Sequence, residues 1–139
     1  MRNNFSITNV YEGKTTKSKI STQLLYGDNF KKLKDYKSWI KIKNKADGYK
    51  GYIKNKNFSK EHKYTHKINS LFANTYLKPS VKFECKNKLS FGSRIKVVKK
   101  KGSFYKFDNM WIKKVNLKNK KFKTKDIFKN IKKFSNVKY

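Results

Sequence analysis

The stretch DGYKGYI, from Asp47 to Ile53, is the part of this sequence whose residue types could contact a ligand. It sets a carboxylate and two phenols beside two glycines, in a region otherwise rich in lysine and asparagine. A carboxylate can form a charge-assisted hydrogen bond and a phenol can donate or accept one. Asp and Gly together are also typical of hairpin turns. Two interpretations of Asp47 and Tyr49 therefore stay open, a ligand contact and a turn.

The residues that most often carry catalysis or bind metal are scarce. Cys85 is the only cysteine, so it cannot form an internal disulfide, and we expect it to behave as a small, partly buried hydrophobic residue. His62 and His66 are four residues apart in a polar stretch without a further ligand nearby. This spacing matches no known metal motif. The sequence predicts no metal site and no cofactor.

The charge of the chain is strongly positive, with a formal net charge of +30 from 38 basic and 8 acidic residues among 139. Such a charge is typical of proteins that bind a polyanion, either nucleic acid or an anionic membrane. However, Arg2 and Arg94 are the only arginines, and arginine is the residue that reads bases and phosphates in a bidentate manner. The lysines accompany many Asn, Ile, Phe and Tyr residues, which AT-rich codons encode, so we favour a genome-wide composition bias as the origin of the charge.

The hydropathy of the chain indicates no secretion or membrane insertion. Residues 1–20 lack the apolar run of a signal peptide. No stretch approaches the roughly 20 apolar residues that a membrane-spanning helix needs. We therefore expect a cytoplasmic protein.

An internal repeat is the most informative feature of the sequence. Residues 23–58 resemble residues 87–117 when Gly27 is placed on Gly92. The second segment then lacks six residues, which are those around Asp47 and Gly48. Both segments alternate apolar residues with lysine, as half-buried strands do. The aligned apolar pairs are Leu24 with Leu89, Phe30 with Ile95, Trp39 with Phe104, Tyr52 with Trp111 and Ile53 with Ile112.

These patterns predict an all-β fold with two small SH3-like barrels in tandem, followed by one short C-terminal α-helix. The expected boundaries are an N-terminal arm over 1–19, a first barrel over 20–59, a second barrel with its lead-in over 60–120, and the helix within 121–139. The apolar run INSLFANTYL, residues 68–77, is expected to be the first strand of the second barrel. The residues assigned to core or turn are Gly27, Trp39, Gly51, Tyr52, Gly92, Phe104 and Trp111.

The helix is predicted from TKDIFKNIKKF, residues 124–134, where Ile127, Phe128, Ile131 and Phe134 share one face. Thr124 is a suitable N-cap for it. A helix with an apolar face needs a partner to pack on. Since the sequence stops soon afterwards, we expect a further domain to have followed it.

The order and spacing of these motifs resemble a known family. The segment TQLLYGD, residues 22–28, the Trp twelve residues after its glycine, and DGYKGYI are similar to a bacterial SH3 domain. More closely, they resemble the first of two such domains that precede the catalytic domain in NlpC/P60 cysteine peptidases of the dipeptidyl-peptidase VI type. The segments THK, TYLKPS and LSFGSRIKVV, at 65–67, 75–80 and 89–98, resemble the second domain of that family.

Enzymes of the family that the sequence resembles cleave the γ-D-glutamyl bond to a diamino acid in peptides derived from the cell wall. The resemblance therefore implies a role in the handling of such peptides. The family's nucleophilic Cys follows an aromatic-Trp-Gly-Gly run, and SNVKY, residues 135–139, resembles the segment just before that run. The resemblance therefore implies that this chain lacks the catalytic Cys and His, and Cys85 does not occupy the catalytic position. It also assigns to Asp47 and Tyr49 the recognition of the free amino end of the peptide.

Two functions thus follow from the sequence. The first is a non-catalytic tandem module of a cell-wall-peptide peptidase, whose partners are the peptide and a missing C-terminal catalytic domain. The second is a basic nucleic-acid-binding protein built on SH3-like barrels, in which aromatic side chains would stack on bases. Binding of the isolated barrels to peptidoglycan is a third, weaker hypothesis.

Overall fold

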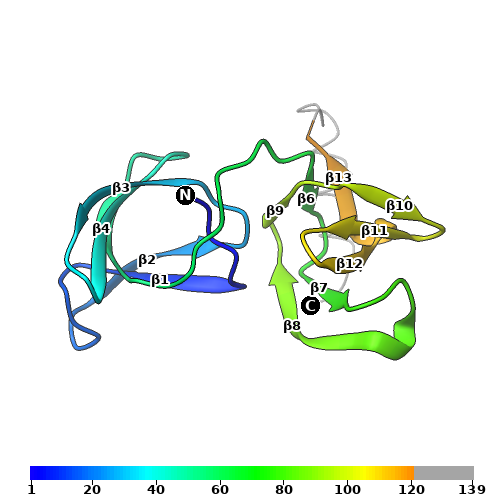
Figure 1. The fold of residues 1–139 in the computed structure, drawn as a ribbon, viewed down its shortest axis with the longest axis horizontal. Helices are drawn as coiled ribbons and strands as arrows, with labels where there is room; N and C mark the ends of the chain where they lie inside the picture. The colour runs from blue at the N-terminus through cyan, green and yellow to red at the C-terminus, as the bar shows by residue number, and fades with distance from the viewer. Residues whose placement is uncertain (121–139) are drawn as a thin grey trace, which may run out of the picture.

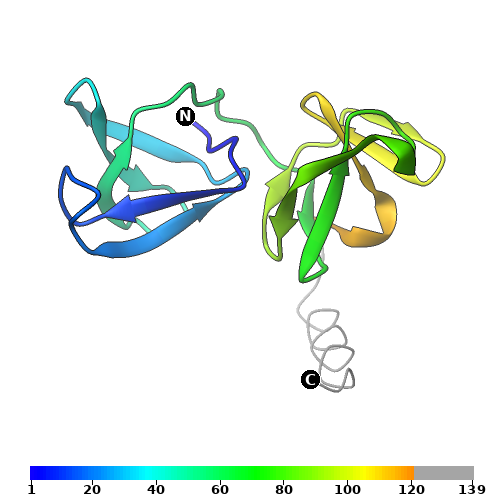
Figure 2. The same ribbon diagram turned by 90° about the horizontal axis from the view of Figure 1, so that it is seen from below.

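The computed structural model describes residues 1–120, and the predicted C-terminal helix lies outside them. The described residues form two lobes, which lie side by side in two perpendicular views (Figure 1, Figure 2). We call residues 1–59 the N-terminal lobe and residues 65–120 the C-terminal lobe; an extended segment connects them. The regular structure is all-β, apart from two short 3-10 helices, η1 (Val81–Phe83) and η2 (Lys114–Asn116). The predicted all-β class is confirmed.

The N-terminal lobe is one antiparallel sheet of five strands, ordered β2-β1-β5-β4-β3. Its alternating sequence explains which face is buried, because successive side chains of a strand point to opposite faces. In β4, Ile40 and Ile42 are fully buried, whereas Trp39 and Lys41 are half-buried. The core also contains Val10, Leu24, Phe30 and Ile53. The strands are β1 (Ile7–Tyr11), β2 (Ile20–Leu25), β3 (Phe30–Asp35), β4 (Trp39–Asn44) and β5 (Lys50–Lys54).

The C-terminal lobe has a five-stranded sheet, ordered β10-β11-β12-β7-β8, and a three-stranded sheet, ordered β13-β6-β9. Its strands are β6 (His66–Ile68), β7 (Phe72–Tyr76), β8 (Glu84–Ser90), β9 (Arg94–Ile95), β10 (Lys99–Lys101), β11 (Phe104–Phe107), β12 (Met110–Lys113) and β13 (Leu117–Asn119). The strand predicted in INSLFANTYL is β7. The core gathers Ile68, Ala73, Leu89, Ile95, Tyr105, Phe107, Ile112 and Leu117, together with Tyr26 from the other lobe.

The two five-stranded sheets repeat one pattern of strand neighbours. Read from its other edge, the C-terminal sheet has the order β8-β7-β12-β11-β10. If its strands are renumbered one to five along the chain, this order becomes 2-1-5-4-3, which is the order β2-β1-β5-β4-β3 of the N-terminal sheet. Gly27 and Gly92, the two glycines of the predicted alignment, have φ angles of +86° and +88°. Thr8 pairs with Leu24 as Ala73 pairs with Leu89. The sequence repeat is therefore also a repeat of backbone structure.

The six-residue gap in the repeat is a difference between two hairpins. In the N-terminal lobe Ile42 pairs with Gly51, and the chain between them makes the β4–β5 hairpin. In the C-terminal lobe Phe107 pairs with Met110 across a two-residue turn, Asp108–Asn109. Asp108 has a φ of +48°, which Asp tolerates better than most residues. The predicted gap thus replaces a long hairpin by a tight turn.

The start of the chain differs from its prediction as an arm over 1–19. Residues 7–11 form β1, which pairs with both β2 and β5. The backbone N–H of Asn3 donates to the Asp28 carbonyl at 2.9 Å, as Ile68 does to Ser93 in the second lobe. Hydropathy could not reveal this equivalence, because Asn3 is fully buried and polar. Its amide donates to the carbonyls of Leu24 and Leu25 and its oxygen accepts from Thr8, so the structure satisfies it internally.

Candidate functional site

The β4–β5 hairpin carries Asp47 and Tyr49, the two residues predicted to contact a ligand. Asp47 Oδ1 accepts a hydrogen bond from the Tyr49 backbone N–H at 2.9 Å. Gly48 between them has a φ of +73°, and its N–H donates to the Asn44 carbonyl at 2.8 Å. Asn44 Oδ1 accepts from the Ala46 N–H. Asp47 therefore has the turn role that the sequence suggested as one alternative, because its carboxylate accepts the backbone N–H of Tyr49.

The side chains of Asp47 and Tyr49 nevertheless remain open to solvent. Tyr49 is 41% exposed, and Asp47 is also exposed. Within residues 1–120 no Lys, Arg or His forms an ion pair with Asp47. The hairpin thus presents an exposed carboxylate and an exposed phenol two residues apart, and such groups can bind a cation such as an ammonium group. The turn and the ligand contact are compatible.

A buried carboxylate that was not among the predicted site residues, Asp28, follows β2. Asp28 accepts the Leu25 N–H at 2.8 Å through Oδ2, and its Oδ1 lies 3.5 Å from Arg94 Nη1 of the C-terminal lobe. Burial raises the pKa of Asp28, and the negative charge of Asp47 raises it further. Asp28 thus joins the turn after β2 to Arg94 of the C-terminal lobe.

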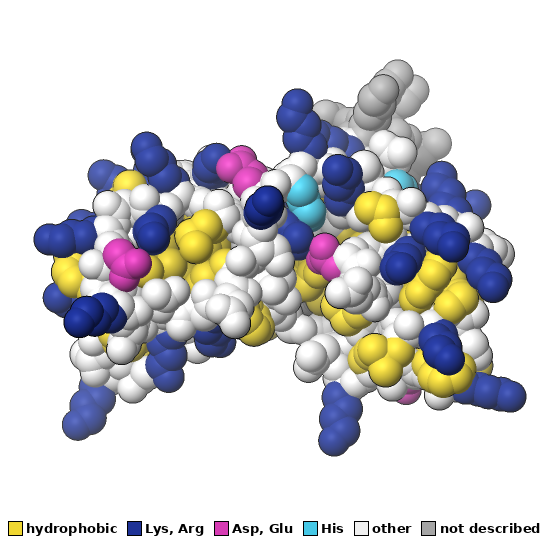
Figure 3. Space-filling view, in the orientation of Figure 1, with side chains coloured by type: hydrophobic (Ala, Val, Ile, Leu, Met, Phe, Trp, Pro, Cys, Tyr) yellow, Lys and Arg dark blue, Asp and Glu magenta, His cyan; other side chains and the backbone are white. Residues whose placement is uncertain are grey.

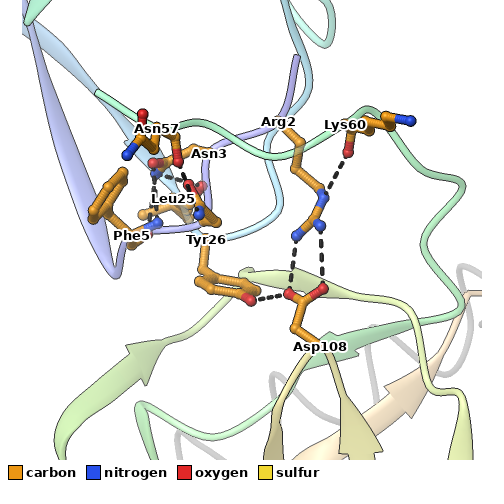
Figure 4. A network of polar contacts seen from close by, with 9 residues as sticks. Arg2, Asn3, Phe5, Leu25, Tyr26, Asn57, Lys60 and Asp108 are labelled. Carbon is orange, nitrogen blue, oxygen red and sulfur yellow. Dashed lines mark hydrogen bonds and ion pairs between the residues drawn. The ribbon is translucent and has the colours of Figure 1, made fainter. Parts of the chain in front are cut away.

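The lobe boundary itself is fixed by Arg2, Tyr26 and Asp108 (Figure 4). Arg2 donates from both Nη atoms to the two Asp108 carboxylate oxygens, at 3.0 and 3.1 Å, and from Nε to the Lys60 carbonyl at 3.0 Å. The Tyr26 hydroxyl also donates to Asp108. Burial alone would raise the pKa of Asp108, but the hydrogen bonds from Arg2 and Tyr26 outweigh it and lower this pKa. Burial and the neighbouring Asp108 raise the pKa of Tyr26.

Tyr26 leaves its own lobe and enters the core of the other. It is 2% exposed, and its ring meets Phe107 edge-on with the ring centroids 5.5 Å apart. The backbones also touch, because the Arg94 N–H donates to the Tyr26 carbonyl at 2.8 Å. A Cβ on Gly27 would lie 1.7 Å from the Arg94 carbonyl oxygen. Gly27 is therefore required both by its positive φ and by contact between the lobes.

The remaining residues assigned to core or turn fall into two groups. Gly51 is buried, and a Cβ there would lie 2.4 Å from Val10 Cγ1, so β1 and β5 approach closely because it is glycine. Phe104 and Trp111 form a small buried cluster with Tyr76. In these contacts the three residues serve the packing of their own lobes. Gly92 occupies the turn equivalent to that of Gly27.

Trp39 and Tyr52 are not core residues. Both are half-buried, on the face of the sheet opposite Ile40 and Ile53. Trp39 packs edge-on against Tyr11, with ring centroids 5.5 Å apart, and Tyr11 pairs with Tyr52 across the strands. The period of two explains the correction, because a residue next to a buried one in a strand faces away from the core. The equivalent C-terminal trio, Tyr76, Phe104 and Trp111, is buried, so this aromatic face is open only in the N-terminal lobe.

The scarce catalytic residue types do not assemble. Cys85 lies in β8, half-buried and without a disulfide. Burial lowers the pKa values of His62 and His66. Within residues 1–120 no three His, Cys, Asp or Glu side chains gather as metal ligands would. That same part of the chain holds no helix long and apolar enough to cross a membrane.

The topology and the hairpin can now be compared with known proteins. Residues 6–59 match the bacterial SH3 domain family. This bacterial SH3 match takes in β1 to β5, and so includes the strand that the sequence analysis assigned to an arm. No curated protein matches the sequence.

The fold is also similar to a solved structure, an NlpC/P60 family protein from Bacillus cereus ATCC 10987. The superposition has a TM-score of 0.68 at 14% sequence identity and covers 85% of this chain. This similarity shows a shared fold that extends beyond the bacterial SH3 segment into the C-terminal lobe. The chain spans 55% of the length of that protein.

Proposed function

We propose that the chain is a non-catalytic tandem bacterial SH3 module of an NlpC/P60 peptidase of the dipeptidyl-peptidase VI type, which helps to bind a cell-wall-derived peptide by its free amino end. The observation that carries this proposal is the order of strands. The C-terminal lobe repeats the topology of the lobe that matches the bacterial SH3 family, which supports a second SH3-like barrel. The similarity to an NlpC/P60 protein over both lobes supports the peptidase context.

The role of the module is assigned to the β4–β5 hairpin. Asp47 supplies a carboxylate for the peptide ammonium and Tyr49 a phenol for a further hydrogen bond. The repeat supports this choice, because the second lobe replaces the same hairpin by a two-residue turn and keeps its fold. Residues that the architecture does not need are available for binding. Catalysis would belong to a Cys- and His-containing domain that residues 1–120 do not contain.

The test uses a synthetic peptide that contains a γ-D-glutamyl bond to a diamino acid. The control is the same peptide with its N-terminal amine acetylated. Their dissociation constants are measured by isothermal titration calorimetry with the chain and with Asp47→Asn. We expect the free amine to bind about tenfold tighter than the acetylated peptide, and Asp47→Asn to remove the difference. A net charge of +30 repels an ammonium group, so a preference for it requires a local carboxylate. Equal affinities of the native chain for the two peptides would refute the assignment.

The variant is suited to this purpose because Asn keeps an oxygen that can accept the Tyr49 N–H. Its folding should therefore be unchanged. The peptidase context has a separate test in the gene itself. Translation beyond codon 139 should continue into a Trp-Gly-Gly segment and then a Cys, and a different continuation would remove that part of the proposal.

A second candidate function is retention on peptidoglycan by the open aromatic face of the N-terminal lobe. Tyr11, Trp39 and Tyr52 are half-buried there, whereas their C-terminal equivalents are buried. Aromatic faces of this kind bind apolar and polar groups of a ligand together. A pull-down with purified cell wall at high salt should retain the native chain and lose Trp39→Ala. Retention that disappears for both at high salt would indicate charge alone.

The distribution of lysine does not favour a nucleic-acid interface. On the face seen in Figure 3, Lys and Arg side chains are scattered around both lobes and do not gather in one groove. A module that tracks a nucleic-acid backbone concentrates its charge along a path. Binding to RNA no tighter than that of a lysine-matched unfolded peptide at the same salt concentration would exclude this function.

A further inference from the structure

A pocket of about 290 Å³ lies between the two lobes, away from the residues assigned to peptide binding. Phe5, Ser6 and Ile7 form its N-terminal wall, and Leu89 and Met110 come from the C-terminal lobe. Its volume is at the lower end of that of small-molecule sites, which often occur between domains. It is large enough for a ligand of the size of one modified amino acid.

The pocket is formed before any ligand binds. Tyr26, which also lines it, is held by Asp108 and Phe107 of the opposite lobe. Figure 4 shows the Tyr26 ring projecting from the N-terminal lobe toward Asp108. On the other wall, Thr75 Oγ1 donates to the Asn87 carbonyl at 2.8 Å. Walls fixed in this way reduce the ordering cost of binding.

The charged residue of the lining, Lys56, defines the chemistry of the ligand. Lys56 provides a cation, and its Nζ lies 4.6 Å from the centroid of the Phe5 ring. No Asp or Glu lines the pocket, so a negative group on the ligand would meet no repulsion there. A charge-assisted hydrogen bond from Lys56 would favour a carboxylate.

Asn4 also lines the pocket, but its amide does not select a ligand. Its Nδ2 donates to the Asn57 carbonyl at 3.2 Å. Its Oδ1 is buried, without a hydrogen-bond partner within the described part of the chain, so a ligand in the pocket would not reach it. Lys56 is therefore the group that selects the ligand.

We propose that this interlobe pocket binds a small carboxylate that carries an aliphatic group, such as an N-acylated aliphatic amino acid. The carboxylate pairs with Lys56, and the aliphatic group packs between the Phe5 and Met110 walls. The ligand is recognised by a negative group and not by an amine, so the site is chemically distinct from the one proposed at Asp47. It does not depend on the proposed function.

The test uses N-acetylleucine, with N-acetylleucine amide as the probe that lacks the carboxylate. Chemical-shift changes of backbone amides in the isotope-labelled chain give both affinities and the place of binding. We expect N-acetylleucine to shift residues around Ser6 and Met110, and to bind about tenfold tighter than the amide. Equal affinities for the two probes, or no shifts in this pocket, would overturn the proposal.

Two variants separate the pocket from the general positive charge. Lys56→Gln should weaken N-acetylleucine binding about tenfold, whereas Lys63→Gln, an exposed lysine outside the lining, removes the same charge and should leave the affinity unchanged. Equal weakening by both variants would show that only the net charge attracts the ligand. Ser6→Tyr fills the pocket from its half-buried rim and should abolish the shifts at Met110. Unchanged binding in Ser6→Tyr would contradict the site.

Discussion

Arg2 and Asp108 are 106 residues apart in the chain and form a two-point ion pair that joins the lobes. The Arg2 side chain is 7% exposed and that of Asp108 is 36% exposed. Removing the charge of Asp108 leaves a buried guanidinium with a weakened partner. Such a pair is therefore much more sensitive to substitution than an exposed one.

Asp108→Asn should lower the free energy of unfolding by about 2 kcal/mol, because it removes a charge-assisted pair while Asn still tolerates the positive φ at this turn. Urea denaturation measures the change. The matched control is Asp35→Asn, whose carboxylate pairs with Lys32 at 3.5 Å on the surface. That control should change stability by less than about 0.5 kcal/mol. An equal loss of free energy of unfolding in both variants would mean that the interlobe pair stabilises the fold no more than an exposed pair does.

The two lobes should unfold together, because Tyr26 belongs to the core of the C-terminal lobe. The chain has two tryptophans, Trp39 in one lobe and Trp111 in the other. Fluorescence of Trp39→Phe and Trp111→Phe therefore reports each lobe separately. We expect coincident urea midpoints in both, and separate midpoints once Tyr26→Ala is added. Separate midpoints without that change would show that the lobes are independent.

The stability of the chain should depend on pH with opposite signs at Asp108 and Asp28. The pKa of Asp108 is lowered from its ordinary value of 3.8, so its stabilising contribution is present above that value and is lost as the pH falls through the folded-state pKa. The stability difference between the native chain and Asp108→Asn should therefore shrink below about pH 4. Denaturant titrations from pH 7 to pH 2.5 measure it.

Asp28 supplies the contrast, since burial raises its pKa above 3.8. The folded state then binds the proton more tightly than the unfolded state, so stability rises as the pH falls from the raised pKa toward 3.8. Relative to Asp28→Asn, the native chain should gain stability over that window. Parallel pH profiles for the two variants would contradict the opposite environments of these carboxylates.

Gly27→Ala should be far more disruptive than Gly92→Ala, although the two glycines have nearly equal φ angles. At Gly92 the nearest atom to a new Cβ is Leu25 Cδ1 at 3.6 Å, which is an ordinary contact. Its cost is the backbone conformation alone, about 1 kcal/mol. At Gly27 the new methyl group overlaps the Arg94 carbonyl oxygen, so we expect a loss of more than about 3 kcal/mol. Similar losses, measured by urea denaturation, would show that the lobes are not in tight contact there.

The sequence could predict the features that depend on local patterns. Alternating apolar residues predicted the strands, and the glycine alignment located Gly27, Gly92 and the hairpin difference. These signals are visible because a strand has a period of two and because a turn with positive φ selects glycine. The exposure of Tyr49 agrees with a repeat that does not require its loop.

The sequence could not predict the features that depend on contacts between distant residues. The sequence repeat did not reveal β1, because the N-terminal lobe has buried Asn3 and Thr8 at the positions where the C-terminal lobe has Ile68 and Ala73. The apolar patterns of the two segments therefore differ. The ring of Tyr26 belongs to the core of the other lobe, and no local pattern indicates this. Nothing in a linear pattern pairs Arg2 with Asp108. The N-terminal arm was therefore predicted where the structure has an integral strand.

The close approach of β1 and β5 gives the last prediction, a double-mutant cycle of Gly51→Ala with Val10→Ala. Gly51→Ala alone places a methyl group 2.4 Å from Val10 Cγ1 and should cost about 2 kcal/mol by overpacking. Val10→Ala alone removes buried methyl groups and should also cost about 2 kcal/mol. The double variant fills part of the space that Val10 vacates, so it should lose about 1 kcal/mol less than the sum. Gly51→Ala combined with Ile112→Val, in the core of the other lobe, should be additive, and additivity in both pairs would refute the contact.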